Sequence, residues 1–151
     1  TGDQQAPLAF KIWKNFALHS PWFPIGRIIS TGSFRKLGPD ELRAYDAPFP
    51  TRGSKAGARI FPSLVPLGQN PAVPDQRAAW EVLDRFEKPF TCAFADRDPI
   101  TRGGDAKFRA RVPGAKGNPL HRTLKGHHFI QEDDPEGFAS AIIETAMRAG
   151  V

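Results

Sequence analysis

A mostly apolar segment that ends in two carboxylates is the feature of the sequence that best indicates chemistry. Residues 90–95 form this segment, and Asp96 and Asp98 follow it directly. Such a run is too short to cross a membrane and is typical of a parallel strand buried on both faces. Open α/β sheets place their reactive groups just past the carboxyl ends of such strands. A carboxylate at this position can therefore serve as a catalytic acid or as the partner of a catalytic base.

A pair of histidines follows the next strand candidate along the chain. Residues 122–124 predict a short strand, and His127 and His128 come soon after it. An acid and an imidazole at the ends of neighbouring strands can pair, and the carboxylate then fixes the ring tautomer and stabilises the imidazolium. The spacing also fits a plainer alternative, in which Asp98-Pro99 starts a turn and the histidines are ordinary loop residues.

The composition is that of one ordinary domain of 151 residues, of which 40% are hydrophobic. The 21 basic residues exceed the 16 acidic ones by a moderate margin and are scattered, so no nucleic-acid partner is expected.

The single cysteine, Cys92, excludes an intrachain disulfide and is expected in the core. The four histidines lack the spacing of metal ligands, so neither a metal nor a cofactor is expected. No signal peptide or membrane span is visible, which predicts a cytoplasmic protein without membrane contact.

Helices separated by prolines are predicted for the first part of the chain. They cover residues 7–20, 25–31, 40–45 and 55–64. In the first of them, Phe10, Trp13, Phe16 and Ala17 fall on one apolar stripe. Helices without strands suit a helical cap rather than a sheet, so residues 1–66 are predicted to form a cap region.

The second part of the chain alternates helices and strands. After a loop at 67–74, the pattern predicts helices at 75–87, 105–111 and 135–148 and strands at 90–95 and 122–124. Asp134-Pro135 predicts the start of the last helix. That helix is expected to pack through four apolar side chains, those of Phe138, Ile142, Ile143 and Ala146.

This alternation predicts an α/β fold and, for residues 67–151, the edge of a doubly wound sheet. Two strands are too few for a stable parallel sheet, and the inner strand would leave an edge unpaired. The sequence therefore predicts an incomplete sheet, and an isolated chain that is insoluble or molten.

Four segments also carry a resemblance to a known family. They are Ala-Asp-Arg-Asp-Pro-Ile at 95–100, His-Phe-Ile-Gln-Glu at 128–132, Ala-Phe-Lys-Ile-Trp at 9–13, and the stretch 44–62 with its Ala-Pro-Phe-Pro. These segments resemble the acid, histidine, cap-helix and cap-to-core segments of haloalkane dehalogenases, which have the α/β-hydrolase fold. The resemblance covers nearly the whole chain. It implies the C-terminal part of that fold, a helical cap followed by the last parallel strands and helices of the sheet.

The resemblance implies a role for each candidate in the hydrolysis of haloalkanes through an aspartyl ester. His128 is implied as the base that activates water and Asp98 as the residue that orients it, with an exchange of roles between His127 and His128 left open. Asp96 is expected to be a surface or turn carboxylate. Trp13 is implied to bind the leaving halide through its indole N–H. Apolar positions that line the substrate pocket are implied for Phe10, Phe49, Pro50 and Ile100.

The nucleophilic aspartate of this family is not found in the sequence. No strand–turn–helix elbow of the form Gly-x-nucleophile-x-Gly occurs in the 151 residues, and the only methionine is Met147. We therefore expect a piece of a longer enzyme, inactive alone. Its expected partners are the haloalkane, the halide ion and an N-terminal half that supplies the nucleophile.

Other activities of the same fold remain alternatives. An epoxide hydrolase usually needs two cap phenols, and the chain has one tyrosine, Tyr45. A haloacid dehalogenase needs a cationic clamp, for which Arg52 and Arg59 are candidates, although both are expected to face solvent. A serine esterase also remains an alternative, because the sequence does not contain the elbow that would show which residue is the nucleophile. An alternative of another class is a non-enzymatic cationic binding module, which would bind polyanions in a strongly salt-dependent way.

Overall fold

The computed structural model describes residues 5–150, which divide into two compact units. The first unit comprises the described residues up to Ile28 together with Gly38–Glu81, and the second comprises Ile29–Leu37 together with the described residues from Val82 onward. None of the helices within residues 5–150 has the length and apolar character needed to span a membrane. The sequence predicted a different division, into a cap region at 1–66 and part of the main domain at 67–151. That division stays a prediction.

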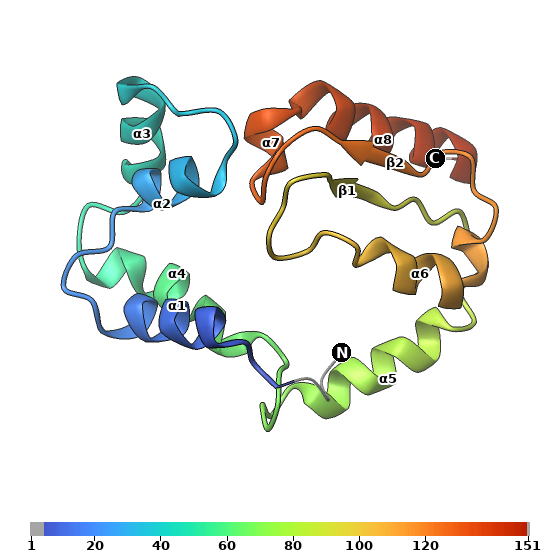
Figure 1. Ribbon diagram of the computed structural model, residues 1–151, viewed down its shortest axis with the longest axis horizontal. Helices are drawn as coiled ribbons and strands as arrows, with labels where there is room; N and C mark the ends of the chain where they lie inside the picture. The colour runs from blue at the N-terminus through green and yellow to red at the C-terminus, as the bar shows by residue number, and fades with distance from the viewer. Residues whose placement is uncertain (1–4, 151) are drawn as a thin grey trace. The chain divides into compact units, whose positions relative to one another are not determined.

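Helices make up the first unit, in agreement with the sequence. They are α1 (Leu8–His19), α2 (Ile25–Gly32), α3 (Pro39–Asp46), the short 3-10 turns η1 (Gly53–Lys55) and η2 (Phe61–Leu64), α4 (Ala56–Ile60) and α5 (Val73–Leu83) (Figure 1). The helix predicted at 55–64 is thus divided, because Pro62 interrupts regular α-helical hydrogen bonding. α2 and α5 run from one unit into the other.

The core of the first unit forms where α1 contacts α4 (Figure 1). Ala17 is fully buried, and the rings of Trp13 and Phe16 stack with centroids 5.7 Å apart. Phe23, from the segment after α1, completes the cluster at 6.0 Å from Trp13. The apolar stripe predicted for the first helix therefore packs as expected.

Arg59 corrects one expectation. It was expected to face solvent, but only 7% of it is exposed. Its Nη1 donates a 2.9 Å hydrogen bond to the carbonyl of Ala17, and its guanidinium lies 4.7 Å from the ring centroid of Phe23. The C-terminal end of α1 and an aromatic face both stabilise a cation, which explains why this charge lies inside.

The second unit contains the parallel strand pair that the sequence predicted. β1 (Ala93–Ala95) pairs with β2 (Arg122–Leu124) in parallel, with Phe94 opposite Thr123. The helices of this unit are α6 (Asp105–Arg111), α7 (Ile130–Asp133) and α8 (Pro135–Ala149), with a 3-10 turn η3 (Pro113–Ala115). Figure 1 shows α8 next to β2 and α6 on the side of β1, where Phe108 of α6 approaches Phe94 with ring centroids 6.4 Å apart.

β1 is shorter than the predicted strand at 90–95 and less buried. The N–H of Phe90 donates to the carbonyl of Gly114, and the N–H of Cys92 donates to Nδ1 of His121. These bonds leave the β ladder, so regular strand pairing begins only at Ala93. Cys92 is buried as expected, but Phe94 is only half-buried. The prediction of a strand buried on both faces is therefore wrong for part of its length.

α8 begins as predicted, but only part of its predicted packing face is buried: Phe138 and Ala146 are half-buried, and the two isoleucines are exposed. The Asp134 side chain accepts the N–H of Gly137, which makes it the N-cap. Ile142 and Ile143 are each 57% exposed, whereas Ala141 is buried and Thr145 donates a 2.7 Å hydrogen bond to the Thr91 hydroxyl. Ala141 and Thr145 are one turn apart, so the face that packs passes through them and not through the predicted isoleucines.

Candidate active site

The structure brings Asp98 and His128 together at the carboxyl ends of the two strands. Nδ1 of His128 lies 3.1 Å from Oδ2 of Asp98. An ionised Asp98 accepts, so Nδ1 donates and Nε2 keeps the lone pair that a general base needs. The side chain of Asp98 is 4% exposed and that of His128 is 37% exposed. The acid is thus buried behind an imidazole that solvent can reach.

Two further donors hold the Asp98 carboxylate. The N–H of Ile100 donates to Oδ1 at 2.8 Å, and the Thr101 hydroxyl donates to Oδ2. Burial raises the pKa of Asp98, but the hydrogen bonds from Thr101, Ile100 and His128 outweigh it, so the pKa lies below its ordinary value. Asp98 is therefore ionised at neutral pH and can stabilise an imidazolium.

Thr101 was missed in the sequence. The signal that could have found it is the Asp-Pro-Ile-Thr order, because a turn that starts at an aspartate brings a hydroxyl three residues later back to the carboxylate. Asp98-Pro99 therefore also starts a turn, as the plainer alternative predicted. Within this turn the Asp98 carboxylate lies within hydrogen-bonding distance of His128.

The two neighbouring histidines have different surroundings. The His127 ring packs edge-on against Phe34, with ring centroids 5.4 Å apart, while the His128 ring reaches Asp98. Asp96, expected to be a surface or turn carboxylate, accepts the N–H of Gly126 at 3.0 Å and so holds the start of the histidine loop. This geometry favours His128 over His127 as the partner of the acid.

The predicted halide-binding residue, Trp13, lies half-buried in the first unit. Its ring is held by Phe16 and Phe23. Among residues 5–150, no hydrogen-bond acceptor engages its indole N–H. This indole N–H is therefore open to an acceptor from outside the described residues.

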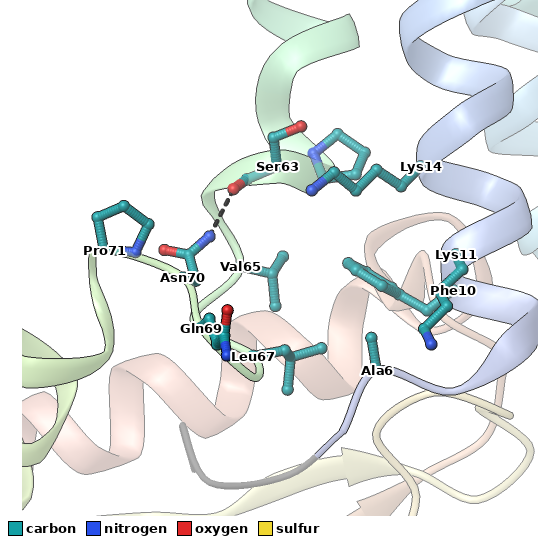
Figure 2. A pocket seen from close by; sticks show the side chains of 11 residues that line it. Ala6, Phe10, Lys11, Lys14, Ser63, Val65, Leu67, Gln69, Asn70 and Pro71 are labelled. Atoms are coloured by element: carbon teal, nitrogen blue, oxygen red, sulfur yellow. Dashed lines mark hydrogen bonds between the residues drawn. The ribbon is translucent and has the colours of Figure 1, made fainter.

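One predicted pocket residue, Phe10, lines a cavity of about 430 Å³ in the first unit (Figure 2). Figure 2 shows Phe10 on α1 opposite Val65 and Leu67, while Asn70 donates a 2.7 Å hydrogen bond to the carbonyl of Ser63. The remaining lining residues are Ala6, Lys11, Lys14, Pro62, Gln69 and Pro71. The lining is mixed, because Lys11, Lys14, Gln69 and Asn70 stand beside the apolar residues.

The other predicted pocket residues lie elsewhere. Phe49 and Pro50 do not line this cavity, and neither does Trp13, the predicted halide-binding residue. Phe49 is half-buried and Pro50 is exposed. Ile100 belongs to the second unit, where its side chain is 69% exposed two residues after Asp98. Within residues 5–150 no group of three or more His, Cys, Asp or Glu side chains could hold a metal ion.

Comparison with known sequences gives a consistent result. The chain is 45% identical over 144 residues to a haloalkane dehalogenase from Mycobacterium marinum, a match that covers 95% of this chain. It is 40% identical over 145 residues to a haloalkane dehalogenase from Psychrobacter cryohalolentis, again over 95% of the chain. The chain is homologous to haloalkane dehalogenases. The resemblance seen in the sequence is thereby confirmed, although no protein-family profile matches the chain.

Solved structures support the fold class. The structure superposes on a putative ancestral haloalkane dehalogenase with a TM-score of 0.72 and 24% identity, covering 99% of this chain and 55% of that one. Haloalkane dehalogenase DatA from Agrobacterium tumefaciens gives a TM-score of 0.71 at 19% identity, covering 97% and 55%. The fold is therefore that of part of an α/β-hydrolase haloalkane dehalogenase, as predicted.

The chain spans about half the length of the curated relatives that it matches. The share is 48% for the proteins from both Mycobacterium marinum and Psychrobacter cryohalolentis.

Proposed function

We propose that the protein takes part in the hydrolytic dehalogenation of haloalkanes, with His128 as general base and Asp98 as the carboxylate that orients it. The observation that carries this proposal is the 3.1 Å contact between His128 Nδ1 and a buried Asp98 carboxylate. The contact frees Nε2 to take a proton, and homology to haloalkane dehalogenases supplies the type of reaction.

The reaction has two steps. A carboxylate attacks the halogen-bearing carbon, a carbon–oxygen bond forms, and the halide leaves with the electron pair of the broken bond. In the second step water gives a proton to Nε2 of His128 and attacks the carbonyl carbon of the ester. The bond between the ester carbonyl carbon and the alkyl oxygen then breaks, and the alkoxide takes the proton from Nε2 of His128 and leaves as the alcohol. The carboxylic acid that remains gives its proton to solvent, which regenerates the carboxylate. We propose that the part of the relatives that this chain does not match supplies the nucleophilic aspartate.

Trp13 is proposed to bind the departing halide. The support is an indole N–H that no acceptor among residues 5–150 engages, on a ring that Phe16 and Phe23 hold in place. The indole has a donor and no acceptor, so it stabilises an anion and does not compete for it. Apolar contact with the substrate stays a prediction for Phe10, Phe49, Pro50 and Ile100, of which Phe10 lines the cavity of the first unit.

A haloacid substrate is less well supported. Such a substrate carries a carboxylate that a cation must hold, and Arg59 was one candidate for this clamp. Arg59 instead donates to the carbonyl of Ala17 and lies over the Phe23 ring. An epoxide hydrolase would need a second phenol in addition to Tyr45, the single tyrosine of the sequence. These observations favour a neutral haloalkane over an epoxide and over a haloacid that Arg59 would hold; Arg52 stays a candidate clamp.

Halide release tests the proposal. The complete protein is given 1-halobutane or 1,2-dihaloethane, and free halide is measured for wild type, His128→Ala and the matched neighbour variant His127→Ala. We expect steady release from wild type, a loss of about 10³-fold or more in His128→Ala, and a much smaller loss in His127→Ala. Full turnover by His128→Ala, or no halide from wild type, would remove the basis of the proposal.

A further inference from the structure

A carboxylate outside the Asp98–His128 pair holds the loop that carries His128. Asp133 is the last residue of α7, and its two oxygens accept four backbone hydrogen bonds. Oδ1 accepts from the N–H groups of Phe34 at 2.9 Å and Arg35 at 3.0 Å. Oδ2 accepts from Phe34 at 2.8 Å and from His127 at 2.8 Å. One side chain therefore joins the segment after α2 to the residue that precedes His128.

The packing around Asp133 leaves it little freedom. A Cβ atom added to Gly126 would lie 2.6 Å from the Cβ of Asp133 and 2.8 Å from its Oδ2, closer than real atoms approach. On the far side of His128, the N–H of Phe129 donates to the carbonyl of Gly32 at 3.3 Å. A Cβ on Gly32 would lie 2.5 Å from the Phe129 ring. The segment after α2 and the histidine loop are thus in close contact on both sides of His128.

The hydrogen bonds place the backbone of His128 between fixed neighbours. Gly126 donates to Asp96, His127 to Asp133 and Phe129 to Gly32. A backbone held before and after His128 fixes the direction of its Cα–Cβ bond, and the ring at the end of that bond reaches Asp98. Asp133 is bonded to both segments. It accepts from His127 in the histidine loop and from Phe34 and Arg35 in the segment that follows Gly32.

The bonds to Asp133 need an ionised carboxylate. Burial raises the pKa of Asp133, but the N–H groups of His127, Phe34 and Arg35 lower it by more, so the group is charged at neutral pH. An asparagine of the same shape would turn an NH₂ group toward backbone N–H donors and leave at least one of them unpaired.

We propose that Asp133 is a positioning residue for His128, tying the segment Gly32–Arg35 to the histidine loop so that Nδ1 of His128 points at Asp98. The effect on kcat rests on the proposed dehalogenation. The effect on the Nδ1–H proton of His128 does not. The hydrogen bonds of the Asp133 carboxylate come from the backbone N–H groups of Phe34, Arg35 and His127, so it acts through the backbone of the loop.

The test uses Asp133→Asn in the complete protein, with Asp134→Asn as the matched control. Asp134 is the next carboxylate along the chain and caps α8, a role that asparagine fills equally well. Histidine labelled with ¹⁵N reports the Nδ1–H proton of His128, which is assigned by its absence in His128→Ala. We expect Asp133→Asn to lower the Nδ1–H population at least twofold and kcat by about 10- to 100-fold, with KM changed less than about twofold. Asp134→Asn should keep wild-type values.

A folded Asp133→Asn with the wild-type Nδ1–H signal and kcat would overturn the inference. If this variant does not fold, Asp133→Glu decides, because the longer side chain keeps the charge but moves both oxygens. A lowered Nδ1–H population in Asp133→Glu supports the role, and an unchanged one overturns it. If wild type releases no halide, the proposed function fails by itself, and the Nδ1–H measurement still decides whether Asp133 orients His128.

Discussion

The two units hold their candidate residues in different ways. In the second unit, Asp98 and His128 are held by directional hydrogen bonds that end on carboxylates. In the first unit, Phe10 and Trp13 lie on a helix whose rings pack against other rings. Hydrogen bonds to charged groups depend on single atoms, whereas apolar packing tolerates replacements of similar shape and volume. Substitutions of similar shape should therefore lower activity in the second unit and be tolerated in the first. The exception is a side chain of the first unit that also provides a hydrogen-bond donor.

The largest effect expected from this comparison is that of Asp98→Asn. The change keeps the shape of the side chain but replaces a carboxylate that accepts from Ile100, Thr101 and His128 by an amide. The amide cannot stabilise an imidazolium and favours the wrong tautomer of the ring, so we expect halide release to fall by about 10³- to 10⁴-fold. Steady-state halide release from the complete protein measures this. A loss below tenfold would show that the pair does not act as a unit.

A smaller effect is expected in the first unit from Trp13→Phe. Phenylalanine keeps an aromatic ring next to Phe16 and Phe23 but removes the indole N–H. If Trp13 only packs, activity should hardly change; if it binds the halide, kcat should fall by about 10- to 100-fold, and we expect the latter. Trp22→Phe is the matched control, because Trp22 is 60% exposed and lies near Arg27. Equal activities for the two variants would assign Trp13 to packing alone.

As the pH falls, the second unit should lose stability before the first unit does. In the second unit, three carboxyl groups have a pKa below the ordinary value, those of Asp84, Asp98 and Asp133. Their stabilisation is fully present above the ordinary pKa of 3.8 and is lost as the pH falls through the lower pKa of the folded protein.

Hydrogen exchange of the complete protein at pH 7 and near pH 3 measures this effect. We expect the amides of β1 and β2 to lose protection in acid before those of α1, and Asp133→Asn to reduce the difference. Loss of protection in α1 first would contradict this assignment of acid sensitivity.

Much of the fold could be predicted from local sequence. The helix at 105–111 and the strand at 122–124 have the predicted bounds, and Asp134-Pro135 marks the start of α8. These features depend on neighbours within a few residues, such as a cap, a proline or an apolar period. α7 was not predicted because a helix of four residues leaves no periodic pattern to detect.

Features that depend on distant partners were missed. The faces of α8 carry apolar residues on more than one side, so its sequence does not show that Ala141 is buried and Ile142 exposed. The burial of Arg59 depends on a carbonyl 42 residues away. The bonds of Asp133 to Phe34 span 99 residues, and no local pattern contains both partners. The Asp98–His128 pair was predictable because two parallel strands must end at one edge.

The measurement that tests the central claim most directly is a rapid-mixing halide assay of His128→Ala in the complete protein. The claim is that His128 activates water in the second step and takes no part in the first. The variant should therefore release a burst of about one halide per active site, gain the mass of the bound alkyl group, and then stop. Continued turnover at the wild-type rate, with no ester bound, would contradict the claim.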